Sequence, residues 1–234
     1  MKTTEIFSSD LPVGEKLSIR RTRFESSTGT SKKQKRISIV SGIHGDELEG
    51  QLVIYLLADW LNKNSDKLKG IVDIYPAVNS LGVDTITRGF PMYEVDLNRA
   101  FPGSPNEFLP GQVVYALAQD VKGSNIAIDI HSSNIFLREI PQIRINKEYS
   151  KSTLPLAKIQ IVPIRMSIGI MPPHKGFFNF TQRKYSTTKS TPAITNPIIK
   201  SIIFTSPLVN VFGFHFSKFI FAVLMSSIYP NKKF

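Results

Sequence analysis

The apolar residues of the first 133 positions fall into short strand-like runs and one long helical pattern. Residues 16–25 alternate between apolar and polar side chains, which is typical of a half-buried strand. Residues 37–42, 70–78 and 125–133 are short apolar runs rich in β-branched side chains, and each predicts a buried strand. Residues 46–64 carry apolar side chains at helical spacing. The pattern therefore predicts strands that alternate with helices.

Such alternation predicts an α/β fold: a mixed, mostly parallel sheet flanked by helices on both faces. The acids Asp46, Glu47 and Glu49 fall in the expected first turn of the helix over 46–64, where the helix dipole favours negative charge. The polar, basic residues 28–36 are expected to form a hairpin-like loop between two strands.

Two histidines, His44 and His131, each lie just past the end of a predicted strand. Ligands of parallel α/β sheets collect beyond the carboxyl ends of the strands, so we expect these side chains to meet there. Glu47 follows His44 by three residues. Two imidazoles and one carboxylate form a known catalytic zinc set, which leaves a fourth position for water. Asp129 is expected to orient the His131 ring without being a metal ligand itself.

The chain has no cysteine, so any metal must be held by His, Asp or Glu. Residues 95–103, VDLNRAFPG, lie between the two histidines in the sequence. In this segment Arg99 offers a planar fork for a carboxylate, and Asn98 adds a directional amide. A surface ion pair is the alternative role for Arg99.

Three segments, GIHGDELEG, DLNRAFPG and DIHSSNIFLREIPQIRIN, together resemble the succinylglutamate desuccinylase/aspartoacylase family, which is related to the zinc carboxypeptidases. The resemblance covers about residues 15–155. It implies a zinc-dependent hydrolase that cleaves an N-acyl amino acid or a similar amide or ester. It also implies one zinc ion per chain, held by His44, Glu47 and His131.

The resemblance assigns further roles by motif position. Asn98 and Arg99 carry over as ligands of the substrate carboxylate, and Arg88 resembles the arginine that polarises the scissile carbonyl. Arg144 is a further candidate for anion binding, with a charge at a strand edge as the alternative. The family's general base is a Glu on a later strand, and no residue here matches it. Glu139 and Glu148 follow His131 too closely to take that position.

The charge distribution divides the chain into two parts. The net charge is +11, yet all 18 Asp and Glu residues lie at or before Glu148. We expect residues 1–155 to form the zinc-binding core and 156–234 to be an atypical basic tail. A natural frameshift or a sequencing error would explain why the acids and the family motifs end together. The sheet is then expected to be incomplete at its C-terminus.

Other interpretations treat the tail as native. Residues 207–229 are apolar over about the length that spans a bilayer, but Lys218 lies in their middle, so membrane contact is not favoured. Aromatic and basic residues mix in the tail without forming a known nucleic-acid module, so no nucleic acid is expected. A non-catalytic metal-binding protein is the alternative to an enzyme. The N-terminus lacks an apolar leader segment, and absence of cysteine fits the cytoplasm, which we expect as the location. The sequence indicates no oligomeric state.

Overall fold

The computed structural model describes residues 1–25, 34–134, 142–145, 167–170 and 200–206. The strands are β1 (Lys2–Asp10), β2 (Lys16–Glu25), β3 (Arg36–Ser41), β4 (Ile71–Tyr75), β5 (Ile126–Ser132), β6 (Gln142–Ile145), β7 (Ser167–Ile170) and β8 (Lys200–Ser206). The α-helices are α1 (Leu48–Lys63), α2 (Ser80–Thr85), α3 (Leu97–Ala100) and α4 (Leu109–Val121), with single 3-10 turns at Pro12–Gly14 and Ser65–Lys67.

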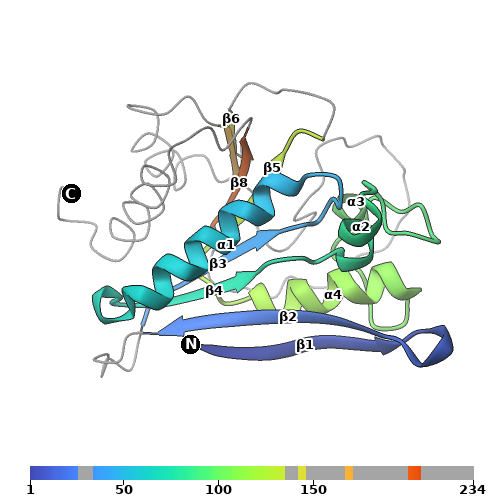
Figure 1. Cartoon of the computed structure of the whole chain (residues 1–234), viewed down its shortest axis with the longest axis horizontal. Coiled ribbons are helices and arrows are strands. Elements are labelled where there is room, and N and C mark those ends of the chain that lie inside the picture. Colours follow the sequence, from blue (N-terminus) through green and yellow to red (C-terminus); the bar gives the residue numbers. More distant parts are fainter. Residues whose placement is uncertain (26–33, 135–141, 146–166, 171–199, 207–234) are drawn as a thin grey trace, which may run out of the picture.

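The strands form one sheet in the order β1-β2-β4-β3-β5-β8-β6-β7. Its centre is parallel, because β4, β3, β5 and β8 run in the same direction. Antiparallel pairs lie toward both edges, where β1 pairs with β2 and β6 pairs with β8. In Figure 1, β1 and β2 form one edge of the sheet, and α1 lies over the central strands. The predicted mixed sheet flanked by helices is confirmed.

The predicted elements are present with small shifts at their ends. The strand expected over 70–78 ends at Tyr75, and the helix expected over 46–64 begins at Leu48. Glu47 is therefore the residue that precedes the helix, and of the three acids only Glu49 lies in its first turn. The sequence patterns did not identify β1 or the helices α2, α3 and α4. Most of the loop expected over 28–36 lies outside the described residues.

The face of the sheet under α1 is apolar. Phe24, Val72 and Ile74 from the strands pack in one buried cluster with Leu57 and Leu61 of α1. These strand residues occupy alternate positions, as expected when every second side chain points to the same face. Burial of this surface fixes α1, and thereby the segment that connects β3 to α1.

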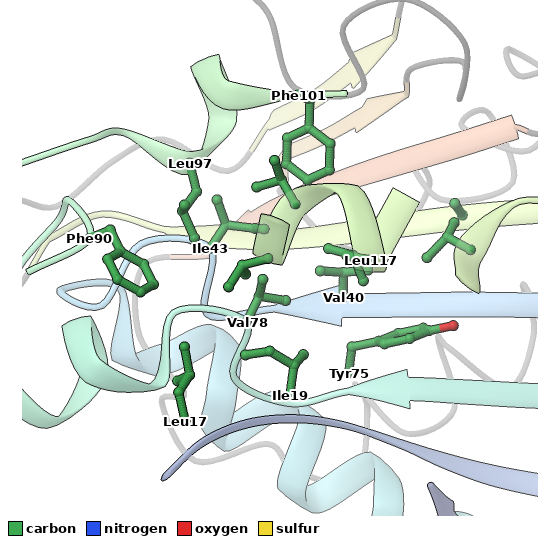
Figure 2. Close-up of a cluster of buried hydrophobic side chains, with 14 residues drawn as sticks. Leu17, Ile19, Val40, Ile43, Tyr75, Val78, Phe90, Leu97, Phe101 and Leu117 are labelled. Atoms are coloured by element: carbon green, nitrogen blue, oxygen red, sulfur yellow. The ribbon is translucent and has the colours of Figure 1, made fainter. Parts of the chain in front are cut away.

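The opposite face packs against α4. Figure 2 shows Leu117 of α4 above Val40, Ile19 and Tyr75 of the sheet. The same cluster continues toward the carboxyl end of β3, where it includes Ile43, Phe90, Leu97 and Phe101 (Figure 2). The loops that follow β3 and precede α4 are thus anchored by one apolar core.

At the amino end of β3 the same face becomes ionic. Asp73 is fully buried and accepts hydrogen bonds from Arg23 and Arg36. Asp120 of α4 accepts hydrogen bonds from Arg21 and from the Tyr75 hydroxyl, at 2.8 Å in both cases. Burial of Tyr75, together with this carboxylate, raises the pKa of its hydroxyl. The network ties α4 to the sheet at the end opposite His44.

No helix in the described part of the chain is long and apolar enough to cross a membrane. The apolar segment 207–229 lies outside the described residues.

Candidate metal site

The two histidines meet because their strands are neighbours. β3 and β5 pair in parallel, with Val40 opposite Asp129 and Ser41 opposite Ile130. His131 lies near the end of β5, and His44 follows β3 after a turn at Gly42, whose φ is +69°. Their ring centroids are 4.9 Å apart. The prediction that both histidines lie at the carboxyl edge of the sheet is confirmed.

Glu47 lies between the two rings. Its Oε1 is 2.7 Å from Nδ1 of His44, and its Oε2 is 2.7 Å from Nδ1 of His131. The backbone N–H of Ser132 also donates to Oε2, at 3.2 Å. All three side chains are buried, and one ligand atom from each lies within 4.8 Å of the others. This group could hold a metal ion.

Each histidine is held on its other side by an aspartate. Nε2 of His131 is 2.6 Å from Oδ2 of Asp129, and Nε2 of His44 is 3.1 Å from Oδ1 of Asp96. When Nε2 carries the proton and donates it to the carboxylate, Nδ1 keeps a lone pair toward the centre of the cluster. The donor set of two imidazoles and a carboxylate, with both rings oriented this way, fits zinc.

The buried acids and histidines of the cluster shift one another's pKa values. Burial alone would lower the pKa of His131, but Asp129 and Glu47 outweigh it and raise that pKa to about 10. Burial would raise the pKa of Glu47, but His131 and His44 lower it below the usual range. Burial raises the pKa of Asp129. A cation at the centre of the cluster would compensate the negative charge of the carboxylates. Nδ1 of each histidine could then remain unprotonated.

Gly45 allows the segment between the ligands to lie against α2. A Cβ at this position would overlap the backbone of Gly82 and Val83. The Gly45 N–H donates to the carbonyl of Thr87 at 3.0 Å, which joins the segment to the loop that carries Arg88. Close approach of two backbones requires glycine here.

Gly45→Ala is therefore expected to destabilise the fold by about 1–3 kcal/mol, because the backbones must separate to admit the methyl group. Urea unfolding with and without zinc measures this effect and the accompanying loss of metal affinity. Gly89→Ala is the comparison variant: the nearest atom to its Cβ is 3.3 Å away, a tight contact that a shift of a few tenths of an ångström relieves, so a smaller loss of stability is expected. An unchanged unfolding midpoint for Gly45→Ala would contradict the close-packing argument.

Arg88, predicted to polarise the scissile carbonyl, and Asn98, a predicted substrate ligand, both contact the cluster directly. The Arg88 guanidinium donates to Oε1 of Glu47 at 3.0 Å while the Arg88 side chain is 54% exposed. Nδ2 of Asn98 lies 3.1 Å from Nε2 of His44, and its Oδ1 is buried without a hydrogen-bond partner. Arg99 is 74% exposed and lies 3.5 Å from Asp96. Arg88 and Arg99 are exposed beside the cluster, and Asn98 is partly buried.

Arg144 lies farther along the sheet. It is half-buried on β6, opposite Ile203 of β8, which is itself opposite Asp129 of β5. Two strand spacings separate it from Asp129, or about 10 Å. Glu139 and Glu148, considered as bases, lie outside the described residues.

Asp96 is the site residue that the sequence reasoning missed. It lies in the segment 95–103, but no pattern in that segment assigns it a role. Its side chain accepts from the backbone N–H of Asn98 at 2.9 Å and caps α3. Burial would raise its pKa, but the hydrogen bond to His44 and the charge of Arg88 lower it. An Asp before a short polar helix is a capping signal, which could have located the helix but not the contact with His44.

Fold and site together define a mixed α/β protein with a buried His–Glu–His cluster at the carboxyl edge of its parallel strands. The profile of the "Succinylglutamate desuccinylase/Aspartoacylase catalytic domain" matches residues 33–191, which is more than half of the chain. The chain belongs to this family. The match begins later and ends later than the span of 15–155 expected from the motifs.

Individual proteins with similar sequence or structure belong to the same family or share its fold. An N-alpha-acetyl-L-2,4-diaminobutyric acid deacetylase from Halomonas elongata is 32% identical over 104 residues, which are 44% of this chain and 30% of that protein. A solved succinylglutamate desuccinylase/aspartoacylase from Rhodobacter sphaeroides superposes with a TM-score of 0.65 at 20% identity, over 92% of this chain and 60% of that one. A structure from Shewanella denitrificans named for carboxypeptidase A gives 0.57 at 14% identity, over 96% and 63%. The chain thus spans less than two thirds of these relatives, and the carboxypeptidase-like fold is confirmed.

Proposed function

We propose that this protein binds one zinc ion at His44, Glu47 and His131 and hydrolyses an N-acyl amino acid. The observation that supports this most directly is the orientation of both imidazoles toward Glu47 by an aspartate on the far side of each ring. Paired carboxylate–histidine contacts of this kind are typical of zinc ligands. The named relatives are deacetylases and desuccinylases, which supports the same class of reaction.

Zinc in such a site supplies a Lewis acid that polarises the amide carbonyl and acidifies a water molecule. The chain's own residues would bind and orient the substrate around it. Arg88 is next to Glu47, where its positive charge can stabilise the negative charge that develops on the carbonyl oxygen. Arg99 and Asn98 would bind the substrate carboxylate and position the amide.

A second candidate function is zinc binding without turnover, and a specific observation favours it. No Asp or Glu follows Glu148 in the sequence. β8, the neighbour of β5, places Thr205 opposite His131 and Ser206 opposite Ser132. The described strands beyond β5 therefore offer no carboxylate to take the proton of the attacking water. A basic tail that contacts a membrane or nucleic acid would belong to this second candidate.

One experiment separates the two candidates. Purified chain is loaded with zinc, its metal content is measured, and amine release is followed for a panel of N-acetyl and N-succinyl amino acids that includes Nα-acetyl-2,4-diaminobutyrate. About one zinc per chain with turnover above the uncatalysed rate, abolished by a chelator, supports the hydrolase. One zinc without turnover of any member supports the non-catalytic candidate. Absence of zinc binding contradicts both.

A further inference from the structure

The loop between α2 and α3 has both of its stems in the metal site. At one stem, Arg88 donates to Glu47. At the other stem, Asp96 contacts His44. Between the stems, the N–H of Phe90 donates to the carbonyl of Val95 at 2.8 Å and closes a tip over residues 91–94. This loop projects outward at the right of Figure 1.

The tip combines backbone strain with exposed apolar side chains. Met92 and Glu94 both have a positive φ, of 68° and 53°, although neither is glycine. Met92 is 71% exposed and Tyr93 is 43% exposed. A left-handed backbone at residues other than glycine is uncommon, and solvated apolar surface gives the fold no stability. Strain of this kind clusters at sites that act on ligands.

An aromatic row extends from the tip to the start of α4. The buried ring of Phe90 lies 6.0 Å from the ring of Tyr93, which lies 5.6 Å from the ring of Phe108. Phe108 is the residue before α4 and is 51% exposed. Phe90 thus anchors the row in the core, and the open faces of Tyr93 and Phe108 form an apolar rim.

We propose that Tyr93 and Phe108 form a subsite for the apolar part of the substrate, so that the preferred substrates are N-acyl derivatives of large apolar or aromatic amino acids. This inference rests on the proposed function. The exposed arginines 88 and 99 lie on the same loop and on the adjoining α3, and they complement the carboxylate and the amide oxygen of such a molecule. The apolar side chain of the ligand would then contact the ring of Tyr93, on the same loop as Arg88, and the ring of Phe108, 5.6 Å from it. Aromatic rings bind flat apolar groups by stacking.

The test measures binding to the zinc-loaded chain by calorimetry, with N-acetyl-L-phenylalanine, N-acetyl-L-leucine, N-acetyl-L-alanine and N-acetyl-L-aspartate as probes. The unsubstituted chain is expected to bind the phenylalanine derivative about tenfold more tightly than the alanine derivative. Tyr93→Ser and Phe108→Ser are each expected to reduce this ratio by about threefold or more. Where turnover is measurable, the ratio of kcat/KM values is compared in the same way.

Tyr55→Ser is the matched control, because Tyr55 is an aromatic residue of α1 that is 69% exposed. It should leave the ratio unchanged, and circular dichroism checks that all variants fold. Measurable binding of the panel with no preference for phenylalanine would overturn the subsite and leave the proposed function standing. Absence of binding by every probe would overturn the subsite, and the proposed function would fail as well only if the wider panel of N-acetyl and N-succinyl amino acids also shows no turnover. An unchanged ratio in Tyr93→Ser together with loss of a dimer in light scattering would also overturn the subsite and assign the rim to a protein contact.

Discussion

His131→Ala is expected to lower the affinity for zinc by more than about 100-fold, because it removes one of the three proposed protein ligands. Loss of an outer partner alone typically costs about 10–100-fold, and Asp129→Asn is expected to fall in that range. The physical reason for the difference is that Asp129 orients the ring at 2.6 Å from Nε2, whereas His131 supplies the donor atom itself. Zinc titration against a competing chelator measures both affinities.

The chain contains its own controls for this prediction. Of its four histidines, the proposed ligand set includes His44 and His131 but neither His174 nor His215, which lie outside the described residues. His174→Ala and His215→Ala should therefore bind zinc as the unsubstituted chain does. Circular dichroism of His131→Ala is needed as well, because removal of the ring takes away the histidine contact of buried Asp129 and one of the two histidine contacts of buried Glu47. If His131→Ala keeps its zinc affinity while either control loses it, the ligand assignment is wrong.

The second large effect concerns the rate of hydrolysis. The zinc-loaded chain is expected to cleave its best N-acyl amino acid about 10²–10⁴-fold more slowly than the Halomonas elongata deacetylase cleaves its own substrate, since a positioned general base contributes about that factor. The reason is the absence of any carboxylate after Glu148. Initial rates under matched zinc and substrate saturation give the comparison.

Added formate or acetate tests whether a missing base limits the rate, because a small carboxylate that reaches the metal site can accept the proton of the attacking water. The expected result is a rate that rises with carboxylate concentration at constant ionic strength, with chloride as the matched salt. A rate within tenfold of the Halomonas enzyme without added carboxylate would show that a residue before position 149 acts as the base. Asp96 would be the first candidate to replace, as its side chain is 21% exposed beside His44.

The sequence predicted which histidines meet at the carboxyl edge of the sheet better than it predicted the loops around them. His44 and His131 lie at the ends of short apolar runs, and such runs identify buried strands. Neighbouring parallel strands bring their carboxyl ends together. The contact between Asp96 and His44 spans 52 residues and depends on how a short helix packs, which no local period encodes. The strand β1 was missed because its residues, KTTEIFSSD, are mostly exposed at an edge and show no clear apolar alternation.

The residues after 155 show that composition alone does not predict where the family domain ends. Absence of acids predicted a break near residue 155, yet the family profile continues to residue 191. Charge is largely a property of the surface, so its loss does not by itself remove the apolar pattern of a fold. The frameshift and the division into a core of 1–155 and a tail of 156–234 stay predictions, and sequencing of the gene across codons 150–165 would test both.

All three proposed ligands precede residue 132, whereas β8, the outer neighbour of β5, is formed by residues 200–206. During synthesis at about 5–20 residues per second, the roughly 70 residues from Ser132 to the end of β8 take about 4–15 s to add. Throughout that interval β5, buried at every position in the folded chain, has no outer neighbour. A zinc ion captured early would join β5 to the segment after β3 and hold this strand on the nascent chain. Zinc supply during translation would then decide how much of the protein escapes aggregation.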